Sequence, residues 1–272
     1  MAIKLVAIDL DDTLLDSGLQ IAPSCLEAIR QVQERGIKVT LATGRMYCSA
    51  LPYARQIKAD LPLITYQGAL VKNSMSGEVL YHRPVSPDLA LEVMEYFRQA
   101  QVHFHTYLND ELYLESLTEE GIAYANMAGV EPRLVPDLME AVRHAPPLKI
   151  MAITDNEKAL LDMEVELKTR FSKLLNITRS KPYFLEVMDH SANKGNALQV
   201  VAEHFGIERK EVLAVGDSYN DLAMIEWAGI GVAMGNARDV VKDAADYVTS
   251  SNEEAGVAEA LQRFILDKHM TE

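Results

Sequence analysis

Short apolar runs alternate with amphipathic segments near the start of this chain, and that alternation limits the fold more than any other feature of the sequence. Residues 4–8 are apolar after the first position, which is typical of a strand buried on both faces of a parallel sheet. Pro23 then begins a segment with apolar residues at every third position, as expected of a helix. Predicted strands at 37–42 and 63–66 flank a second predicted helix at 45–59. This order indicates an α/β domain with a parallel sheet.

The C-terminal part of the chain repeats the alternation. Apolar runs predict three strands, at 212–215, 230–233 and 247–249. Amphipathic segments predict helices before, between and after them, at 194–205, 220–228, 237–244 and 253–265. We expect both ends of the chain to form one Rossmann-like α/β core.

Residues 84–189 have a different pattern. Pro84 and Pro87 interrupt the chain, and short alternating segments and helices then follow in mixed order. Such a mixture is typical of an α+β domain. We therefore predict an inserted α+β domain at 84–189 and a core domain formed by 1–83 and 190–272.

Acidic residues outnumber basic ones, 40 to 26, and the formal net charge is −14 at pH 7. This charge would repel nucleic acid and anionic membrane surfaces, so we expect neither as a partner. The two cysteines, Cys25 and Cys48, cannot build a disulfide framework, and no apolar run approaches the length of a membrane span. An acidic cluster interrupts the first apolar run before a signal peptide could be completed. We expect a cytoplasmic protein.

Carboxylates follow the first predicted strand directly. Asp9, Asp11 and Asp12 lie within four residues, and Asp217 follows the strand at 212–215. Ligands of open α/β sheets bind beyond the carboxyl ends of the strands, so these side chains should meet there. Carboxylates held so close together repel one another and need a cation, and Mg²⁺ prefers oxygen ligands. Asp9 would keep an oxygen for nucleophilic attack, and Asp11 could hold a proton for a leaving group.

Two further segments favour an anion site at the same edge. Thr43-Gly44 follows the second predicted strand and offers a hydroxyl and a backbone N–H at the start of a helix. Lys194 begins a later predicted helix. A phosphate dianion that approaches several carboxylates needs a positive side chain besides the metal, and Lys194 could supply it.

These segments resemble the four motifs of the haloacid dehalogenase superfamily. The insertion between the second and third motifs is similar to the C2-type cap of the Cof-type, subclass IIB sugar-phosphate phosphatases, the bacterial YidA-like group. The resemblance covers essentially the whole chain. The matching segments are Asp9-x-Asp11-x-Thr13, Thr43-Gly44-Arg45, Lys194 and Gly216-Asp217-x-x-Asn220-Asp221.

The resemblance implies a Mg²⁺-dependent phosphatase for small phosphomonoesters. It implies that Asp9 is the nucleophile and forms an aspartyl phosphate, and that Asp11 is the general acid and then the base. It places Mg²⁺ on the Asp9 carboxylate, the Asp11 carbonyl and Asp217, with Asp221 supporting the ligands. The phosphate would be held by the Leu10 N–H, Thr43, Gly44, Lys194 and Asn220.

Two positions depart from the family pattern. Asp12 stands where the family often has Gly, which predicts a positive φ angle there and a conformational role for Asp12. Gln67-Gly68-Ala69 stands where Asn-Gly-Ala is common, so a contact on the substrate side is expected to differ.

Other interpretations remain open at this point. A phosphomutase could use the same scaffold, and it would move phosphate within a sugar rather than release it. A phospho-accepting signalling module also uses an Asp cluster, Mg²⁺, Thr and Lys, but about half this length would suffice. His103 and His105 alternate on one predicted strand without an evident third metal ligand, so we expect them at the surface of the inserted domain or against substrate.

Overall fold

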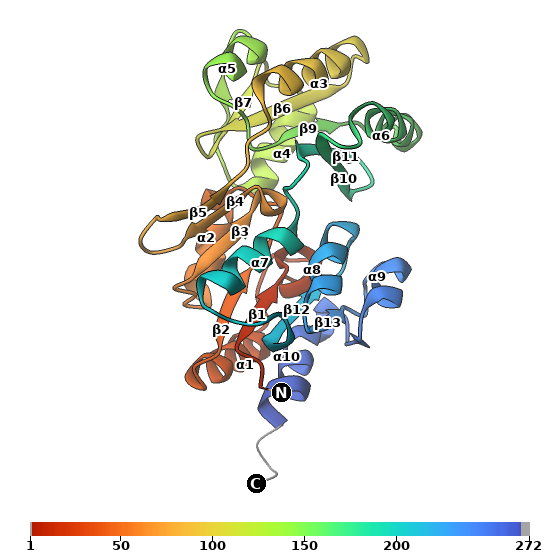
Figure 1. The fold of residues 1–272 in the computed structure, drawn as a ribbon. Coiled ribbons are helices and arrows are strands. Elements are labelled where there is room, and N and C mark those ends of the chain that lie inside the picture. Colours follow the sequence, from red (N-terminus) through yellow and green to blue (C-terminus); the bar gives the residue numbers. More distant parts are fainter. Residues whose placement is uncertain (1, 268–272) are drawn as a thin grey trace. The chain divides into compact units, whose positions relative to one another are not determined.

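The computed structural model describes residues 2–267 (Figure 1). The chain divides into two compact units. The core unit comprises Met1–Gly44, Ala50–Tyr81 and Asn193–Glu272, and the inserted unit comprises Arg45–Ser49 and His82–Ala192. The predicted α/β class, with a parallel core sheet and an additional α+β unit, is confirmed.

The main sheet of the core unit is parallel, in the order β14-β13-β12-β1-β2. Its strands are β1 (Leu5–Ile8), β2 (Lys38–Leu41), β12 (Val212–Gly216), β13 (Ile230–Ala233) and β14 (Tyr247–Val248). The first strand is central and pairs with β2 on one side and with β12 on the other. All four of its residues are buried, as the apolar run predicts.

Beside this sheet lies a small sheet in the order β3-β4-β5. Its strands are β3 (Pro62–Thr65), β4 (Leu70–Asn73) and β5 (Val79–His82). A single parallel bridge between Ala42 and Ile64 connects the two sheets. The turn from β3 to β4 therefore begins near the carboxyl end of β2.

The helices around the two sheets are α1 (Pro23–Glu34), α2 (Tyr47–Gln56), α7 (Lys194–His204), α8 (Leu222–Trp227), α9 (Asp239–Ala244) and α10 (Gly256–Leu261). Of these, α1, α8 and α9 contact strands of the main sheet, and α7 contacts β3 and β4. Helix α7 packs against α8, and α1 packs against α10 (Figure 1). Short helical turns stand at Leu10–Leu14, Tyr66–Gly68, Arg209–Glu211, Tyr219–Asp221, Asn252–Glu254 and Gln262–Leu266.

The inserted unit contains one sheet in the order β10-β11-β9-β6-β7-β8. Its strands are β6 (His103–Leu108), β7 (Glu111–Leu114), β8 (Arg133–Leu134), β9 (Ile150–Ile153), β10 (Leu175–Lys181) and β11 (Phe184–Asp189). All neighbours are antiparallel except β7 and β8. The helices are α3 (Pro87–Gln99), α4 (Glu119–Ala128), α5 (Leu138–His144) and α6 (Glu157–Phe171). The sequence did not predict β8 or α5, which are the shortest strand and helix of this unit.

The two faces of this sheet differ. Apolar residues of one face, such as Ile150 and Val187, pack with α3, α5 and α6 in one cluster. On the other face His105 is hydrogen-bonded to His103 (3.1 Å) and to the Tyr107 hydroxyl (2.9 Å). Both His105 and Tyr107 are fully buried, so the predicted surface position of His105 is wrong.

A buried ion pair lies on the same face of the sheet. The ammonium group of Lys149 is 3.3 Å from the carboxylate of Glu186 and 5.0 Å from the centre of the Tyr107 ring. Glu186 also accepts a hydrogen bond from the Ser180 hydroxyl. Among residues 2–267, no helix is both long and apolar enough to cross a membrane.

Candidate active site

The polar segments of the core unit follow neighbouring parallel strands. Asp9 comes directly after β1, Asp217 comes directly after β12, and Thr43 lies two residues after β2. Because these strands are parallel neighbours, their carboxyl ends lie at one edge of the sheet. The pairing of the strands therefore brings these segments together, as the sequence predicts.

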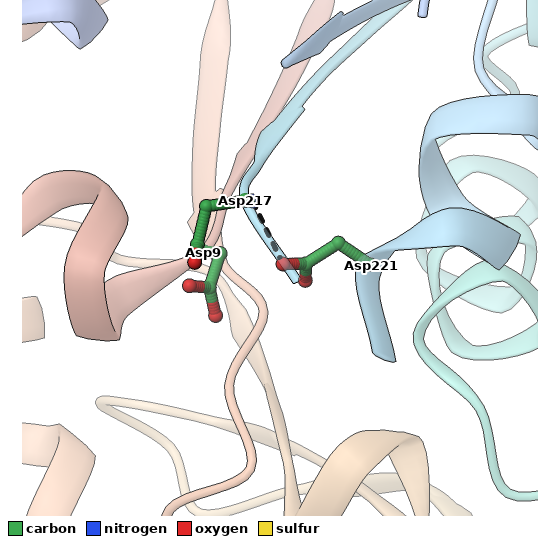
Figure 2. A group of neighbouring side chains, drawn as sticks. All are labelled: Asp9, Asp217 and Asp221. Carbon is green, nitrogen blue, oxygen red and sulfur yellow. Dashed lines mark hydrogen bonds between the residues drawn. The ribbon is translucent and has the colours of Figure 1, made fainter. Parts of the chain in front are cut away.

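Three carboxylates converge at this edge. Oxygens of Asp9, Asp217 and Asp221 lie within 4.8 Å of one another (Figure 2). One oxygen of Asp221 accepts hydrogen bonds from the N–H groups of Asp217 and Ser218, each at 3.0 Å. An all-oxygen donor set of this kind suits a hard divalent cation.

Lys194 reaches two of these carboxylates. It is the first residue of α7, and the side chain of the preceding Asn193 caps that helix by accepting the N–H of Asn196 (2.8 Å). The Lys194 ammonium is 2.5 Å from Asp9 Oδ1 and 2.6 Å from Asp221 Oδ1, and its side chain is completely buried. A buried lysine between two carboxylates fixes the position of Asp9 relative to α7.

The site holds more negative than positive groups, and the pKa values reflect this. Burial, and then the neighbouring Asp221, raise the pKa of Asp9 well above its usual value. The same two causes raise the pKa of Asp217 to about 7. Burial would lower the pKa of Lys194, but Asp221 and Asp9 outweigh burial and raise it. Excess negative charge in a buried cluster favours the binding of a further cation, so the residues fit a metal site.

The turn that follows Asp9 contains the remaining acidic residues. Asp12 has φ 59° and ψ 9°, so the positive φ angle expected at this position is confirmed. Its side chain is exposed, and its carbonyl accepts a hydrogen bond from Asn236 (2.7 Å). The Thr13 hydroxyl donates to Asp217 Oδ1 (2.9 Å), and Asp11 is close enough to contribute to the raised pKa of Asp9. Sequence reasoning did not assign a role to Thr13 or Asn236.

The segment after β2 is held by its backbone. The N–H of Thr43 donates to the Ile64 carbonyl (2.8 Å), and the Thr43 carbonyl accepts the N–H of Gln67 (3.1 Å). The side chain of Gln67 lies against Gly44 and accepts a hydrogen bond from Asn220 (2.8 Å). The structure thus brings Asp9, Lys194, Asp217 and Asp221 into direct proximity, and Gln67 connects Gly44 with Asn220. The sequence marked Gln67 as unusual but did not predict this contact.

Comparison with known proteins places these residues in context. A family model described as haloacid dehalogenase-like hydrolase matches residues 6–261. Among curated proteins, the Bacillus subtilis 5-amino-6-(5-phospho-D-ribitylamino)uracil phosphatase YcsE is 33% identical over 97% of this chain and 96% of its own length. The HMP-PP phosphatase of Serratia proteamaculans is 30% identical over 98% of this chain and 97% of its own length.

Solved structures match the chain over nearly its full length. The crystal structure of a haloacid dehalogenase-like hydrolase from Bacteroides thetaiotaomicron is 35% identical, with a TM-score of 0.86. The match covers 96% of this chain and 99% of that chain.

Proposed function

The chain belongs to the haloacid dehalogenase-like hydrolases and is a phosphatase of that family, and we propose that it hydrolyses small phosphomonoesters through a phosphorylated Asp9 in a Mg²⁺-dependent reaction. One observation carries this proposal. The buried Asp9 carboxylate lies 2.5 Å from the Lys194 ammonium, in a cluster with two further carboxylates. This arrangement places a nucleophile beside a cation that attracts phosphate.

Asp9 and Asp217, with the backbone carbonyl of Asp11, would hold Mg²⁺. When bound, the ion neutralises negative charge on the carboxylates and on the phosphoryl oxygens. Asp221 is committed to Lys194 and to two backbone N–H groups, so its part is to fix the positions of Lys194 and Asp217.

The chain's own residues would bind and orient the phosphoryl group. Lys194 offers the positive charge, and its place between Asp9 and Asp221 leaves it little freedom to move. Neutral donors would hold the remaining phosphoryl oxygens. These donors are the Thr43 hydroxyl, the N–H groups of Leu10 and Gly44, and the side-chain amide of Asn220.

The reaction then has two steps. An Asp9 oxygen attacks phosphorus in line with the leaving oxygen, that P–O bond breaks, and the Asp11 carboxyl gives its proton to the leaving alkoxide. In the second step Asp11 takes a proton from water as the water attacks the aspartyl phosphate. Inorganic phosphate leaves, and Asp9 is restored.

The expected substrates are sugar phosphates and related phosphorylated polyols. The 33% identical relative from Bacillus subtilis is named for a phospho-ribityl compound, whose phosphate sits on a sugar-alcohol chain. The relative from Serratia is named for a different substrate, HMP-PP, so similar chains differ in what they bind. We assign the choice among substrates to an inserted domain at 84–189, which would also exclude water during the reaction.

The direct test is a screen for phosphate release. Sugar phosphates, nucleotides and phosphorylated cofactors are each incubated with the protein, with and without Mg²⁺. We expect release from sugar phosphates that stops when the metal is chelated. Isomerised sugar phosphate without free phosphate would instead identify a mutase.

Asp9→Asn tests the covalent step. The amide keeps the shape of the side chain but is not a nucleophile, so turnover and acid-stable phosphorylation of the protein should both disappear. Asp60→Asn is the matched control, because Asp60 is an exposed aspartate of the same unit. Substantial turnover in a folded Asp9→Asn protein would remove Asp9 from this role.

A further inference from the structure

The turn Tyr66–Gly68 between β3 and β4 has an uncommon backbone. Its residues have φ angles of 51°, 57° and 95°, and Tyr66 and Gln67 carry side chains that disfavour this region. Neighbouring segments hold the turn in place. The Gln67 N–H donates to the Thr43 carbonyl, and a Cβ atom on Gly68 would collide with the carbonyl of Asn193. The turn is therefore fixed between the segment after β2 and the start of α7.

This turn directs the Gln67 side chain toward the candidate active site. The residue is only 2% exposed. Its amide lies so close to Gly44 that any Cβ atom on Gly44 would overlap the Gln67 Nε2 atom. At the other end of the same amide, Oε1 accepts a hydrogen bond from Asn220 Nδ2 at 2.8 Å. Gly44 thus leaves the room that Gln67 needs to reach Asn220.

Asn220 depends on this contact for its orientation. Its segment is held through the backbone, because Asp221 accepts the N–H groups of Asp217 and Ser218. Across residues 2–267, however, the hydrogen bond to Gln67 is the one that the Asn220 side chain makes, and Asn220 Oδ1 is buried without a partner. The two ends of an amide have nearly the same shape, so packing alone does not distinguish them.

We propose that Gln67 is a positioning residue of the phosphate site, which holds the Asn220 amide in the one orientation that the bound phosphoryl group requires. The inference rests on the proposed function and deepens it. Gln67 has the chemistry for this task. Its amide provides a hydrogen-bond partner for Asn220 and adds no negative charge where a phosphate must bind.

Gln67→Met tests the proposal, because methionine has a similar length and lacks the amide. We expect the inhibition constant of inorganic phosphate and the KM of the ester substrate to rise together, roughly 3- to 10-fold, the scale of one lost hydrogen bond. The kcat should change less. Gln33→Met is the matched control, because Gln33 is another glutamine of the core unit whose Nε2 donates to a backbone carbonyl, that of Ile57 (2.9 Å). It should leave both constants unchanged.

A double-mutant cycle shows whether Gln67 acts through Asn220. In an Asn220→Ala background, Gln67→Met should change the phosphate inhibition constant by less than about twofold, because the group to be oriented is already gone. Losses that multiply in the double variant would overturn the proposal. So would a Gln67→Met protein that is less stable to heat but binds phosphate as well as the wild type.

The side-chain NH₂ signals of Asn220 give a measurement that does not depend on activity. In nitrogen-15 spectra these signals are identified because they disappear in Asn220→Ala. Their chemical shifts should change in Gln67→Met but not in Gln33→Met. If the signals move but no ester is hydrolysed, the proposed function fails and the contact stands. If esters are hydrolysed and the signals do not move, the positioning role alone is overturned.

Discussion

Each unit of this protein contains a fully buried lysine, and the two lysines have different surroundings. In the core unit, Lys194 lies 2.5 and 2.6 Å from two carboxylates, and a third carboxylate, that of Asp217, belongs to the same cluster. In the inserted unit, Lys149 lies 3.3 Å from the carboxylate of Glu186 and 5.0 Å from the centre of the Tyr107 ring. The first lysine lies in a cluster of three carboxylates, whereas the second forms a buried ion pair with Glu186.

The difference separates a site for ligands from a structural ion pair. A cluster with excess negative charge favours the binding of a further cation, and it holds pKa values away from their usual range. A one-to-one pair is already neutral, and its removal chiefly affects folding. Burial of a lysine is thus no sign of function by itself, but the balance of charge around it is.

The largest effect is expected for Lys194→Met. Turnover should fall roughly 10³-fold, because the phosphoryl group loses its charged donor and Asp9 loses the contact that positions it. Binding of Mg²⁺, followed by calorimetry, should not weaken, since the carboxylates remain. The exposed Lys210 gives the control variant Lys210→Met. If a folded Lys194→Met protein kept normal turnover, Lys194 would have no role in the reaction and would not differ from Lys149 in function.

Lys149→Met should act on stability instead. A buried Glu186 without its partner should lower the free energy of unfolding in urea by roughly 3–5 kcal/mol. The double variant Lys149→Met with Glu186→Met should recover most of that loss, because an apolar pair of similar volume needs no charge balance. Turnover of the folded single variant should stay near that of the wild type. Lost turnover at unchanged stability would place Lys149 in the active site.

A smaller effect is expected from His105, next to Lys149. Burial, and then the nearby His103 and Lys149, lower the pKa of His105 well below 6.5. The folded state keeps this imidazole neutral, whereas the unfolded state takes up a proton below about pH 6.5. Stability should therefore decrease as the pH falls from 6.5, by up to about 1.4 kcal/mol per pH unit for this one proton.

Urea unfolding of wild type and His105→Gln between pH 7 and 5 measures this dependence, and the variant should show the shallower slope. Equal slopes would mean that the pKa of His105 is the same in the folded and unfolded states, which would contradict a neutral, buried imidazole.

The smallest effect is expected for Asp12→Asn. The Asp12 side chain is exposed and its φ angle is 59°, a region that Asn tolerates well. Turnover and the Mg²⁺ requirement should stay within about twofold of the wild type, while Asp12→Val should cost roughly 1–3 kcal/mol through backbone strain and slow the reaction. If Asp12→Asn needed much more Mg²⁺ for activity, Asp12 would have to be counted among the acidic residues that bind the metal.

Features that depend on local pattern could be predicted from the sequence. The apolar run before Asp9 predicted the buried β1, and a position often taken by glycine predicted the left-handed backbone of Asp12. The parallel sheet followed from the alternation of strands and helices, and it brought Asp9 and Asp217 to one edge. The short helix α5 was missed, because seven residues contain too little periodicity to be recognised.

Contacts between distant residues could not be predicted in this way. Gln67 and Asn220 are far apart in the chain, and nothing in the pattern around either one indicates the other. The burial of His105 was missed for the same reason, because it depends on strands and on a helix that follow later in the chain. The spacing of apolar and polar residues in the sequence indicates which face of a helix or strand a side chain occupies. It does not indicate which other element packs against that face.

The central position of β1 has a consequence for how the protein is made. This strand pairs with β2, which is synthesised soon after it, and with β12, which is synthesised about 200 residues later. Until then one edge of β1 is without its final partner, and the carboxylates of Asp217 and Asp221 do not yet exist. All strands of the inserted unit lie between β5 and β12 in the chain, so they are synthesised before β12. A chain truncated before β12 would therefore leave one edge of β1 unpaired, and such an edge promotes aggregation.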